Sequence, residues 1–203
     1  MNQKGRSMIE MLGVLAIIGV LSVGGISGYT KAMMKHKTNS TTELMLTIIT
    51  NVQNVTLKDK KYTSNLPLVA KKMKAIPEKA ISGSQLVNPF GGSIQLGGFG
   101  SGGTGEYKYF YVAMNNLPRD ACVEMATANY GNALIFAGPG TFSTLMSNLV
   151  SKVGENLKQA GSACGGSSSA GAYCLKQIMS PDKASVGCSC NNAGGCTVAL
   201  IPF

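Results

Sequence analysis

Acidic residues and histidine are both scarce in this chain, and their scarcity argues against most enzyme chemistry. Only nine of the 203 residues are Asp or Glu, and the single histidine, His36, lies among lysines with no acidic residue beside it. No Ser/His/Asp or Cys/His catalytic group is recognisable. The glycine-rich stretch from Gly97 to Gly105 is not followed by the Gly-Lys-Ser/Thr of a phosphate-binding loop. We therefore expect no enzyme activity and no cofactor.

A concentrated run of basic residues is also missing, although the chain is basic overall. Lys and Arg number 18, which gives a formal net charge of +9. No Arg-rich stripe and no nucleic-acid-binding motif occurs, so no specific nucleic-acid site is expected. The charge remains compatible with an anionic membrane surface or an acidic partner. The scattered basic residues include Lys58, Lys60, Lys61, Lys71, Lys72 and Lys74.

Cysteine is absent from the first 121 residues, and the chain has no Cys-x2-Cys pair. An even number of cysteines in a loop-rich C-terminal half favours disulfides in an oxidising compartment. A zinc site is the alternative, but the usual ligand spacing is absent and His36 is far away, so no metal is expected. The six cysteines are Cys122, Cys164, Cys174, Cys188, Cys190 and Cys196.

One long apolar run is present near the N-terminus. Met11 to Ile26 contains no charged residue, and the 19 residues from Met11 to Tyr29 would form about 28 Å of helix, close to the roughly 30 Å of a bilayer core. A secretory signal peptide would carry its main positive charge before the run, whereas here more lysines follow it. An ordinary membrane anchor does not explain Glu10, because a carboxylate in a membrane helix is costly. A third alternative is a helix that leaves the membrane and packs against copies of itself.

The stretch KGRSMIE, from Lys4 to Glu10, together with the apolar run resembles the class III signal of type IV prepilins. The resemblance implies that a prepilin peptidase cuts after Gly5 and that Arg6 becomes the methylated first residue. Arg6 departs from the family, which usually has Phe, Met or Leu there. In this family organisation, the leader would be residues 1–5, the stalk helix residues 6–57 and the globular head residues 58–203. Residues 8–29 of the stalk would lie in the membrane and later in the filament core.

The resemblance also implies a role for Glu10, which would stand at position five of the mature chain. In the family this glutamate neutralises the N-terminal amine of a neighbouring subunit, here the α-amine of Arg6. Both charges need a partner in hydrocarbon, so a subunit docked at the wrong height would leave a buried charge unpaired. The alternative is an interfacial carboxylate that the dipole at a helix N-terminus stabilises.

Glycines interrupt the apolar run at intervals. Each costs a helix about 1 kcal/mol relative to alanine, so the segment from about Gly19 to Gly28 could unwind and lengthen the stalk in a filament, as filaments of the family often do. Gly24 and Gly28 also fit close helix–helix approach in a membrane. The glycines assigned to the melting segment are Gly19, Gly24, Gly25 and Gly28, and Gly13 lies before them.

Past Tyr29 the apolar spacing predicts that the helix continues, either as one rod, which we favour, or as two pieces with a new start at Ser40 and Glu43. The fold class expected is α+β, with a long N-terminal helix packed on an antiparallel sheet. A linker follows over residues 58–88. The other elements expected are helices at 68–73, 116–129 and 143–158, strands at 107–114, 132–137 and 196–203, and turns with a hairpin at 91–105.

This element order, with the Asn88-Pro89-Phe90 turn, resembles type IVb major pilins, the class that includes the toxin-coregulated pilin. The resemblance implies a disulfide between Cys122 and a cysteine near the last strand, which could be Cys188, Cys190 or Cys196, and spacing from that strand favours Cys190. Cys164–Cys174 and Cys188–Cys196 would then close two small loops. A leader of five residues is shorter than most in this class, and four cysteines exceed the single family disulfide.

The resemblance implies a structural subunit of a type IV pilus, which polymerises through its N-terminal helix. Its partners would be other pilin subunits, the prepilin peptidase and methylase, and the inner-membrane assembly platform. The subunit would reside in the bacterial inner membrane and then in the extracellular filament. The alternatives are a minor pilin, a type II secretion pseudopilin or a plain anchored adhesin. A pseudopilin usually has an acidic calcium-binding loop near its C-terminus, whereas here Asp182 is the only acidic residue after Glu155.

Overall fold

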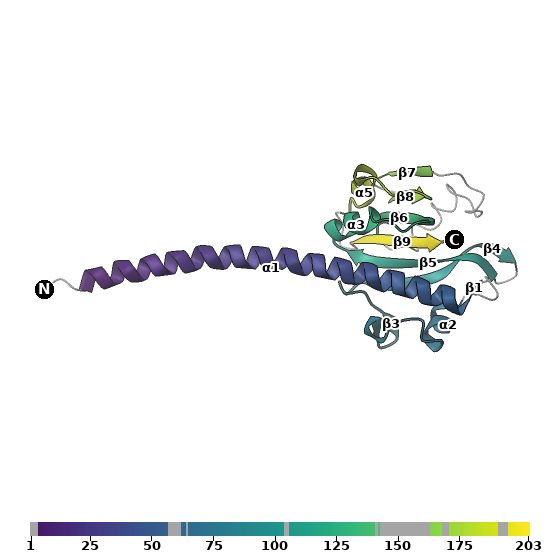
Figure 1. Ribbon diagram of the computed structural model, residues 1–203, viewed down its shortest axis with the longest axis horizontal. Coiled ribbons are helices and arrows are strands. Elements are labelled where there is room, and N and C mark those ends of the chain that lie inside the picture. The colour runs from purple at the N-terminus through teal and green to yellow at the C-terminus, as the bar shows by residue number, and fades with distance from the viewer. Residues whose placement is uncertain are drawn as a thin grey trace. The chain divides into compact units, whose positions relative to one another are not determined.

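A computed structural model describes residues 4–56, 62–63, 65–103, 106–140, 142, 163–167, 171–190 and 195–203. The chain divides into two compact units, Met1–Lys37 and Thr38–Phe203. The first unit contains only helix within its described residues, and the second contains the sheet and the remaining helices (Figure 1).

Helix α1 runs without a break from Lys4 to Val55, a length of 52 residues. This confirms the single rod and excludes a new helix start at Ser40. The threonines in this region hydrogen-bond inside the helix instead of capping it, since Thr42 Oγ1 donates to the Thr38 carbonyl at 3.1 Å and Thr47 Oγ1 to the Glu43 carbonyl at 2.8 Å. The ends of α1 differ by two residues from the predicted 6–57.

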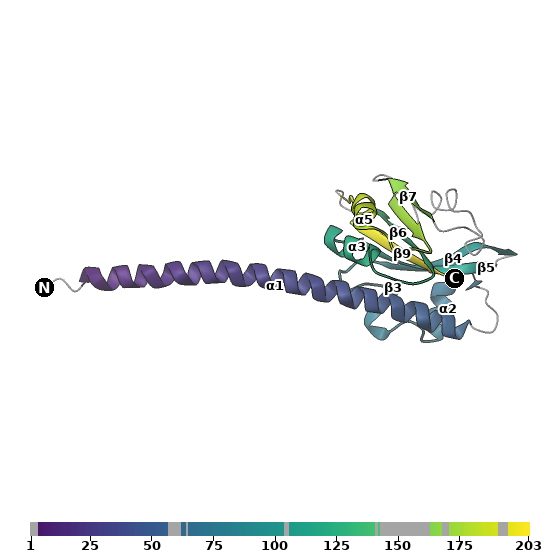
Figure 2. The same cartoon turned by 45° about the horizontal axis from the view of Figure 1, so that its top comes forward.

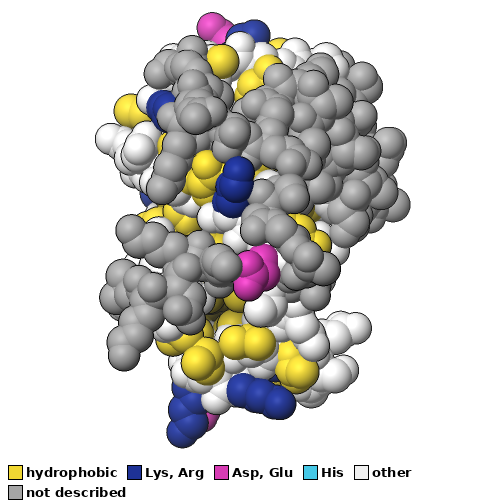
Figure 3. Space-filling model, turned by 90° about the vertical axis from the view of Figure 1, so that its right-hand side faces the viewer, with side chains coloured by type: hydrophobic (Ala, Val, Ile, Leu, Met, Phe, Trp, Pro, Cys, Tyr) yellow, Lys and Arg dark blue, Asp and Glu magenta, His cyan; other side chains and the backbone are white. Residues whose placement is uncertain are grey.

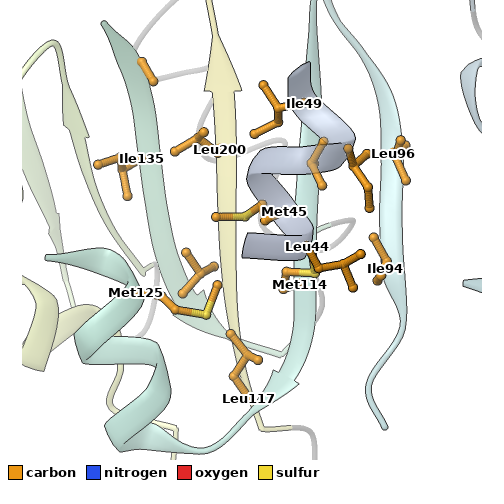
Figure 4. Packing of buried hydrophobic residues seen from close by; sticks show 14 of the residues in the cluster. Leu44, Met45, Ile49, Ile94, Leu96, Met114, Leu117, Met125, Ile135 and Leu200 are labelled. Atoms are coloured by element: carbon orange, nitrogen blue, oxygen red, sulfur yellow. The ribbon is translucent and has the colours of Figure 1, made fainter. Parts of the chain in front are cut away.

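The part of α1 that belongs to the second unit is amphipathic and packs on the sheet. Its apolar residues recur at intervals of three and four, which places them on one helical face. They lie in the main hydrophobic cluster with residues of the strands, among them Ile94, Met114 and Leu200 (Figure 4). The buried residues of this face are Leu44, Met45, Ile48, Ile49 and Val52.

The sheet is antiparallel throughout its described pairs, with the order β1-β5-β9-β6-β8-β7 and with β4 paired to β5. A separate hairpin of β2 and β3 follows a 3-10 turn at Glu78–Ala80. The strands are β1 (Tyr62–Thr63), β2 (Ile81–Ser82), β3 (Gln85–Leu86), β4 (Ile94–Gly103), β5 (Glu106–Leu117), β6 (Ala133–Pro139), β7 (Ala163–Ser167), β8 (Gly171–Leu175) and β9 (Cys196–Pro202).

Both faces of the central strands are buried, and alternate residues enter two different clusters. On β5, Phe110 and Val112 join the cluster under α1, whereas Tyr109 and Ala113 join a second cluster on the opposite face. Strands β6 and β9 alternate in the same way, which explains why their sequences are almost continuously apolar. The antiparallel helix-on-sheet fold that the sequence predicted is confirmed.

The described residues of the second unit also form three short α-helices: α2 (Leu66–Lys72), α3 (Arg119–Ala126) and α5 (Pro181–Gly187). Helices α3 and α5 lie side by side at one end of the sheet (Figures 1 and 2). Helix α2 is the short helix expected at 68–73, and α3 is a shorter form of the one expected at 116–129. The sequence analysis missed α5, although Ser180 followed by Pro181 is a typical helix start. The amphipathic helix expected at 143–158 lies outside the described residues.

The glycine-rich stretch at 91–105, expected as turns with a hairpin, is largely strand β4, which pairs with β5 as an antiparallel hairpin. The hairpin is confirmed, but strand fills more of the stretch than expected. Its glycines are needed because tyrosine rings of β5 lie over them. A Cβ atom on Gly97 would lie 2.6 Å from Tyr111 Oη, and one on Gly98 would lie 2.1 Å from Tyr107 Cγ. Aromatic rings covering glycines across strands stabilise such a pair despite the low β-propensity of glycine.

The Asn88-Pro89-Phe90 turn is held by the Asn88 side chain, which is only 4% exposed. Its Oδ1 atom accepts hydrogen bonds from the amides of Phe90 at 2.9 Å and Gly92 at 3.0 Å. Its Nδ2 atom donates to the Asn115 carbonyl on β5 at 2.8 Å. One side chain therefore fixes the turn and attaches it to the sheet.

Candidate functional site

The apolar segment of α1 exposes large hydrophobic side chains on every side. Between Met8 and Ile26 these side chains are 53–76% exposed. A helix that is apolar all round needs a membrane or other protein to cover it. Within the described residues one helix, Met8–Val55, passes the length and composition test for crossing a membrane. The covering of this segment must therefore come from outside the unit.

Two hydroxyl groups in the first unit, those of Ser22 and Thr30, hydrogen-bond to carbonyls of the helix itself. Ser22 Oγ donates to the Ile18 carbonyl at 2.7 Å, and Thr30 Oγ1 donates to the Ser27 carbonyl at 2.9 Å. Such bonds let a hydroxyl group enter an apolar surrounding without a partner on another helix. Glu10 is then the only ionisable residue between Arg6 and Lys31, apart from Tyr29 at the end of the run.

Gly5 and Arg6 lie in the first turn of α1, and Glu10 lies one turn further along. Four residues separate Arg6 from Glu10, which corresponds to a rise of about 6 Å on one helical face. The predicted cut site after Gly5 and the Glu10 carboxylate therefore lie within two turns of the same helix. Their roles in processing and assembly remain predictions.

The glycines of the apolar run have no steric cause within the chain. A Cβ atom built on Gly13, Gly19, Gly24, Gly25 or Gly28 meets nothing within 4 Å. The backbone is helical through all of them. No contact within the described residues therefore accounts for these glycines, and both melting and close helix approach stay predictions.

Three disulfides use all six cysteines: Cys122–Cys188, Cys164–Cys174 and Cys190–Cys196. The Cys164–Cys174 pair is as expected, and it joins directly opposite residues of β7 and β8. The predicted pairs Cys122–Cys190 and Cys188–Cys196 are wrong.

The unpredicted helix α5 explains the error in pairing. It ends at Gly187, and the next residue, Cys188, caps the helix and is fully buried, whereas Cys190 lies further along the chain and is partly exposed. Helix α5 packs against α3, and this contact brings Cys188 to Cys122. Spacing from the last strand could not reveal a contact that depends on a helix.

Basic residues of the head do not gather into one stripe on the face drawn in Figure 3, where lysines and arginines stand apart with acidic side chains among them. This distribution on the described residues of that face gives no support to a nucleic-acid groove.

Comparisons with known proteins agree with this architecture. A family model described as PilS N terminal matches residues 34–170. The chain is 25% identical over 133 residues to the major structural subunit of bundle-forming pilus from Escherichia coli O127:H6 (strain E2348/69 / EPEC) and to that from Escherichia coli O111:H-. Each alignment covers 64% of this chain and 67% of the relative.

Among solved structures, a type IV b pilin from Salmonella typhi resembles the chain in fold. The superposition covers 81% of this chain and 98% of that chain, with a TM-score of 0.50 and 17% sequence identity. The long helix packed on an antiparallel sheet with C-terminal disulfides is therefore a type IV pilin fold. The chain belongs to the PilS family of type IVb pilins, which are structural subunits and not enzymes. The family and the fold predicted from the sequence are confirmed.

Proposed function

We propose that this chain is the major structural subunit of a type IVb pilus and polymerises through its N-terminal helix. The observation that carries the proposal is an apolar helix, exposed all round, on the same chain as a head of the PilS family. The family match starts at residue 34, beyond the apolar run, so the two features support the proposal independently. Both relatives are named as major structural subunits, which favours a major over a minor subunit.

Processing at Gly5 is the first step of this proposal. A prepilin peptidase cuts after Gly5 and leaves a chain of 198 residues, which is 203 less the five of the leader. Arg6 then carries a new α-amine, which the same enzyme methylates. The position of Gly5 five residues before the lone carboxylate Glu10 supports this assignment.

Glu10 sets the register between subunits. In the membrane and in a filament core its carboxylate has a low-dielectric surrounding, where an opposite charge stabilises it strongly. The α-amine of Arg6 of a neighbouring subunit supplies that charge. Before assembly the subunit waits in the bacterial inner membrane with its head in the oxidising periplasm, and an inner-membrane platform moves it into the filament. The three disulfides fit this compartment.

The substitution Glu10→Leu tests the register role, with Glu43→Leu as a matched control on the same helix. Glu43 is an exposed residue of the part of α1 that packs on the sheet. We expect Glu10→Leu to remove filaments seen by electron microscopy while precursor accumulates in the membrane, and Glu43→Leu to keep filaments. Wild-type numbers of filaments from Glu10→Leu cells would favour a plain anchored adhesin instead.

A further inference from the structure

Three sulfur atoms meet in the core of the head. The Sγ atoms of Cys122, Cys188 and Cys196 all lie within 4.8 Å of one another, and all three residues are fully buried. Only Cys122 and Cys188 are bonded to each other, because Cys196 is bonded to Cys190. Two separate disulfides therefore bring three of their four sulfur atoms to within 4.8 Å of one another.

Three packed elements hold this sulfur cluster, which we define as Cys122, Cys188 and Cys196. Cys122 lies on α3, Cys188 caps α5, and Cys196 is the first residue of β9. Cys196 pairs with Leu117 of β5, which precedes α3. The α3 helix contacts both α5 and β9, so the three sulfur atoms stay close in the folded head.

The Cys190–Cys196 disulfide has one accessible end and one buried end. Cys190 is partly exposed, whereas Cys196 is fully buried. Cys190 packs against the core cluster but retains part of its surface, so it is the end of this disulfide that a small thiol could reach. Attack on Cys190 Sγ would form a mixed disulfide there and leave the electron pair on Cys196 Sγ. The thiolate released in this way lies inside the sulfur cluster, next to the Cys122–Cys188 bond.

We propose that the sulfur cluster is an internal thiol–disulfide exchange site to which Cys190 gives access. The Cys196 thiolate attacks Cys122 Sγ, a Cys122–Cys196 bond forms, and Cys188 leaves as a thiolate. Cys188 then attacks Cys190 Sγ in the mixed disulfide, forms a Cys188–Cys190 bond and releases the external thiolate. The protein has two disulfides in this region before and after, so the external thiol acts as a catalyst and no oxidant is consumed.

The chemical class of partner is a monothiol such as glutathione, or a thiol–disulfide isomerase with an exposed cysteine. Dissolved thiols do not reach the three buried sulfur atoms directly. Exchange among these three atoms is unimolecular, so it is faster than attack by a thiol from solution. Both pairings keep Cys122 on α3 joined to the C-terminal part of the chain. The site lets the head reach its final pairing late in folding without unfolding.

The variants Cys190→Ser and Cys196→Ser test the proposal in the full-length protein in detergent. Each lacks the same disulfide, but Cys190→Ser leaves a free thiol inside the sulfur cluster and Cys196→Ser leaves one outside it. Free thiols are blocked at low pH after incubation at pH 8, and non-reducing peptide mapping then identifies the pairs. In Cys190→Ser we expect peptides in which Cys122 is joined to Cys196. In Cys196→Ser, peptides in which Cys122 is joined to any cysteine other than Cys188 should be at least about tenfold less abundant.

In the wild-type protein, catalytic glutathione should generate the same Cys122–Cys196 peptides. Because both variants lose one disulfide, general destabilisation would scramble both to a similar extent, and that outcome overturns the proposal. A Cys190→Ser protein that retains only the Cys122–Cys188 pair overturns it as well.

Discussion

Tyr130 connects α1 to the region after α3 through its hydroxyl group. Its Oη atom donates to the Met125 carbonyl at 2.9 Å, and the Thr42 side chain of α1 interacts with the same hydroxyl group. The pKa of Tyr130 is raised to about 12, chiefly by burial; the interaction with Thr42 lowers the pKa and the nearby Glu124 carboxylate raises it, and both effects are smaller than that of burial. The folded head therefore favours the neutral phenol.

This shift makes the stability of the head sensitive to alkaline pH. In the unfolded chain the phenol of Tyr130 ionises near its usual pKa of about 10. Its contribution to folding is then fully present below pH 10 and is lost as the pH rises toward about 12, since the unfolded state releases the proton first. We expect the free energy of unfolding, measured with urea, to fall by up to about 2 kcal/mol over this window from this residue.

The substitution Tyr130→Phe identifies that contribution. Below pH 10 the variant should be less stable than the wild type because it lacks the hydrogen bond to Met125. Between pH 10 and 12 its free energy of unfolding should fall by less than that of the wild type, and the difference is the contribution of Tyr130. Tyr29→Phe, which changes an exposed tyrosine of the other unit, is the control. A wild-type pH dependence in Tyr130→Phe contradicts the prediction.

At the scale of elements, the glycines of α1 allow a clean test of melting. A methyl group at Gly24, Gly25 or Gly28 meets no other atom of the chain, so alanine fits each site. Each change should stabilise the helix by about 1 kcal/mol. If the filament needs an extended segment, the triple Gly→Ala variant should remain folded in the membrane and yield few filaments, or filaments with a shorter rise.

A cryo-electron microscopy map of wild-type and variant filaments gives the measurement. Gly13→Ala is the matched control, because it strengthens the same helix outside the proposed segment. Continuous helical density through Gly19–Gly28 in wild-type filaments would exclude melting and leave close helix approach as the reason for these glycines.

The elements that the sequence predicted are those whose pattern is local. The α1 helix has apolar residues at helical intervals, and strands β5, β6 and β9 are runs rich in apolar, β-branched or aromatic residues. These patterns can be recognised without knowing which surface each element packs against. The hairpin at 91–105 was expected, but the length of strand β4 was underestimated, because Gly97 and Gly98 are explained only by tyrosines on a different strand. The disulfide partner of Cys122 was missed because it depends on how α5 packs against α3. Both errors concern contacts between segments, which composition and spacing do not encode.

At the scale of the whole molecule, the apolar surface of the first unit needs to be covered inside a filament. Large side chains are exposed along the helix from Met8 to Ile26, and equivalent helices of neighbouring subunits would supply a matching surface. The relatives that are named as major structural subunits favour a chain that occupies most positions of the filament. A minor pilin would occupy a few positions, and a pseudopilin would not build a long filament.

We therefore expect filaments sheared from cells to contain this chain as their main protein. Its intact mass should match residues 6–203 with three disulfides and one N-terminal methyl group. Cells carrying Gly5→Ile supply the control, because a bulky residue before the cut should retain the precursor of 203 residues in the membrane and prevent filaments. If the filaments consist mainly of another protein and contain only a trace of this chain, the chain is a minor subunit. If the mature N-terminus is a residue other than Arg6, the proposed cut site is wrong, and the Glu10→Leu variant still tests the assembly role of Glu10 separately.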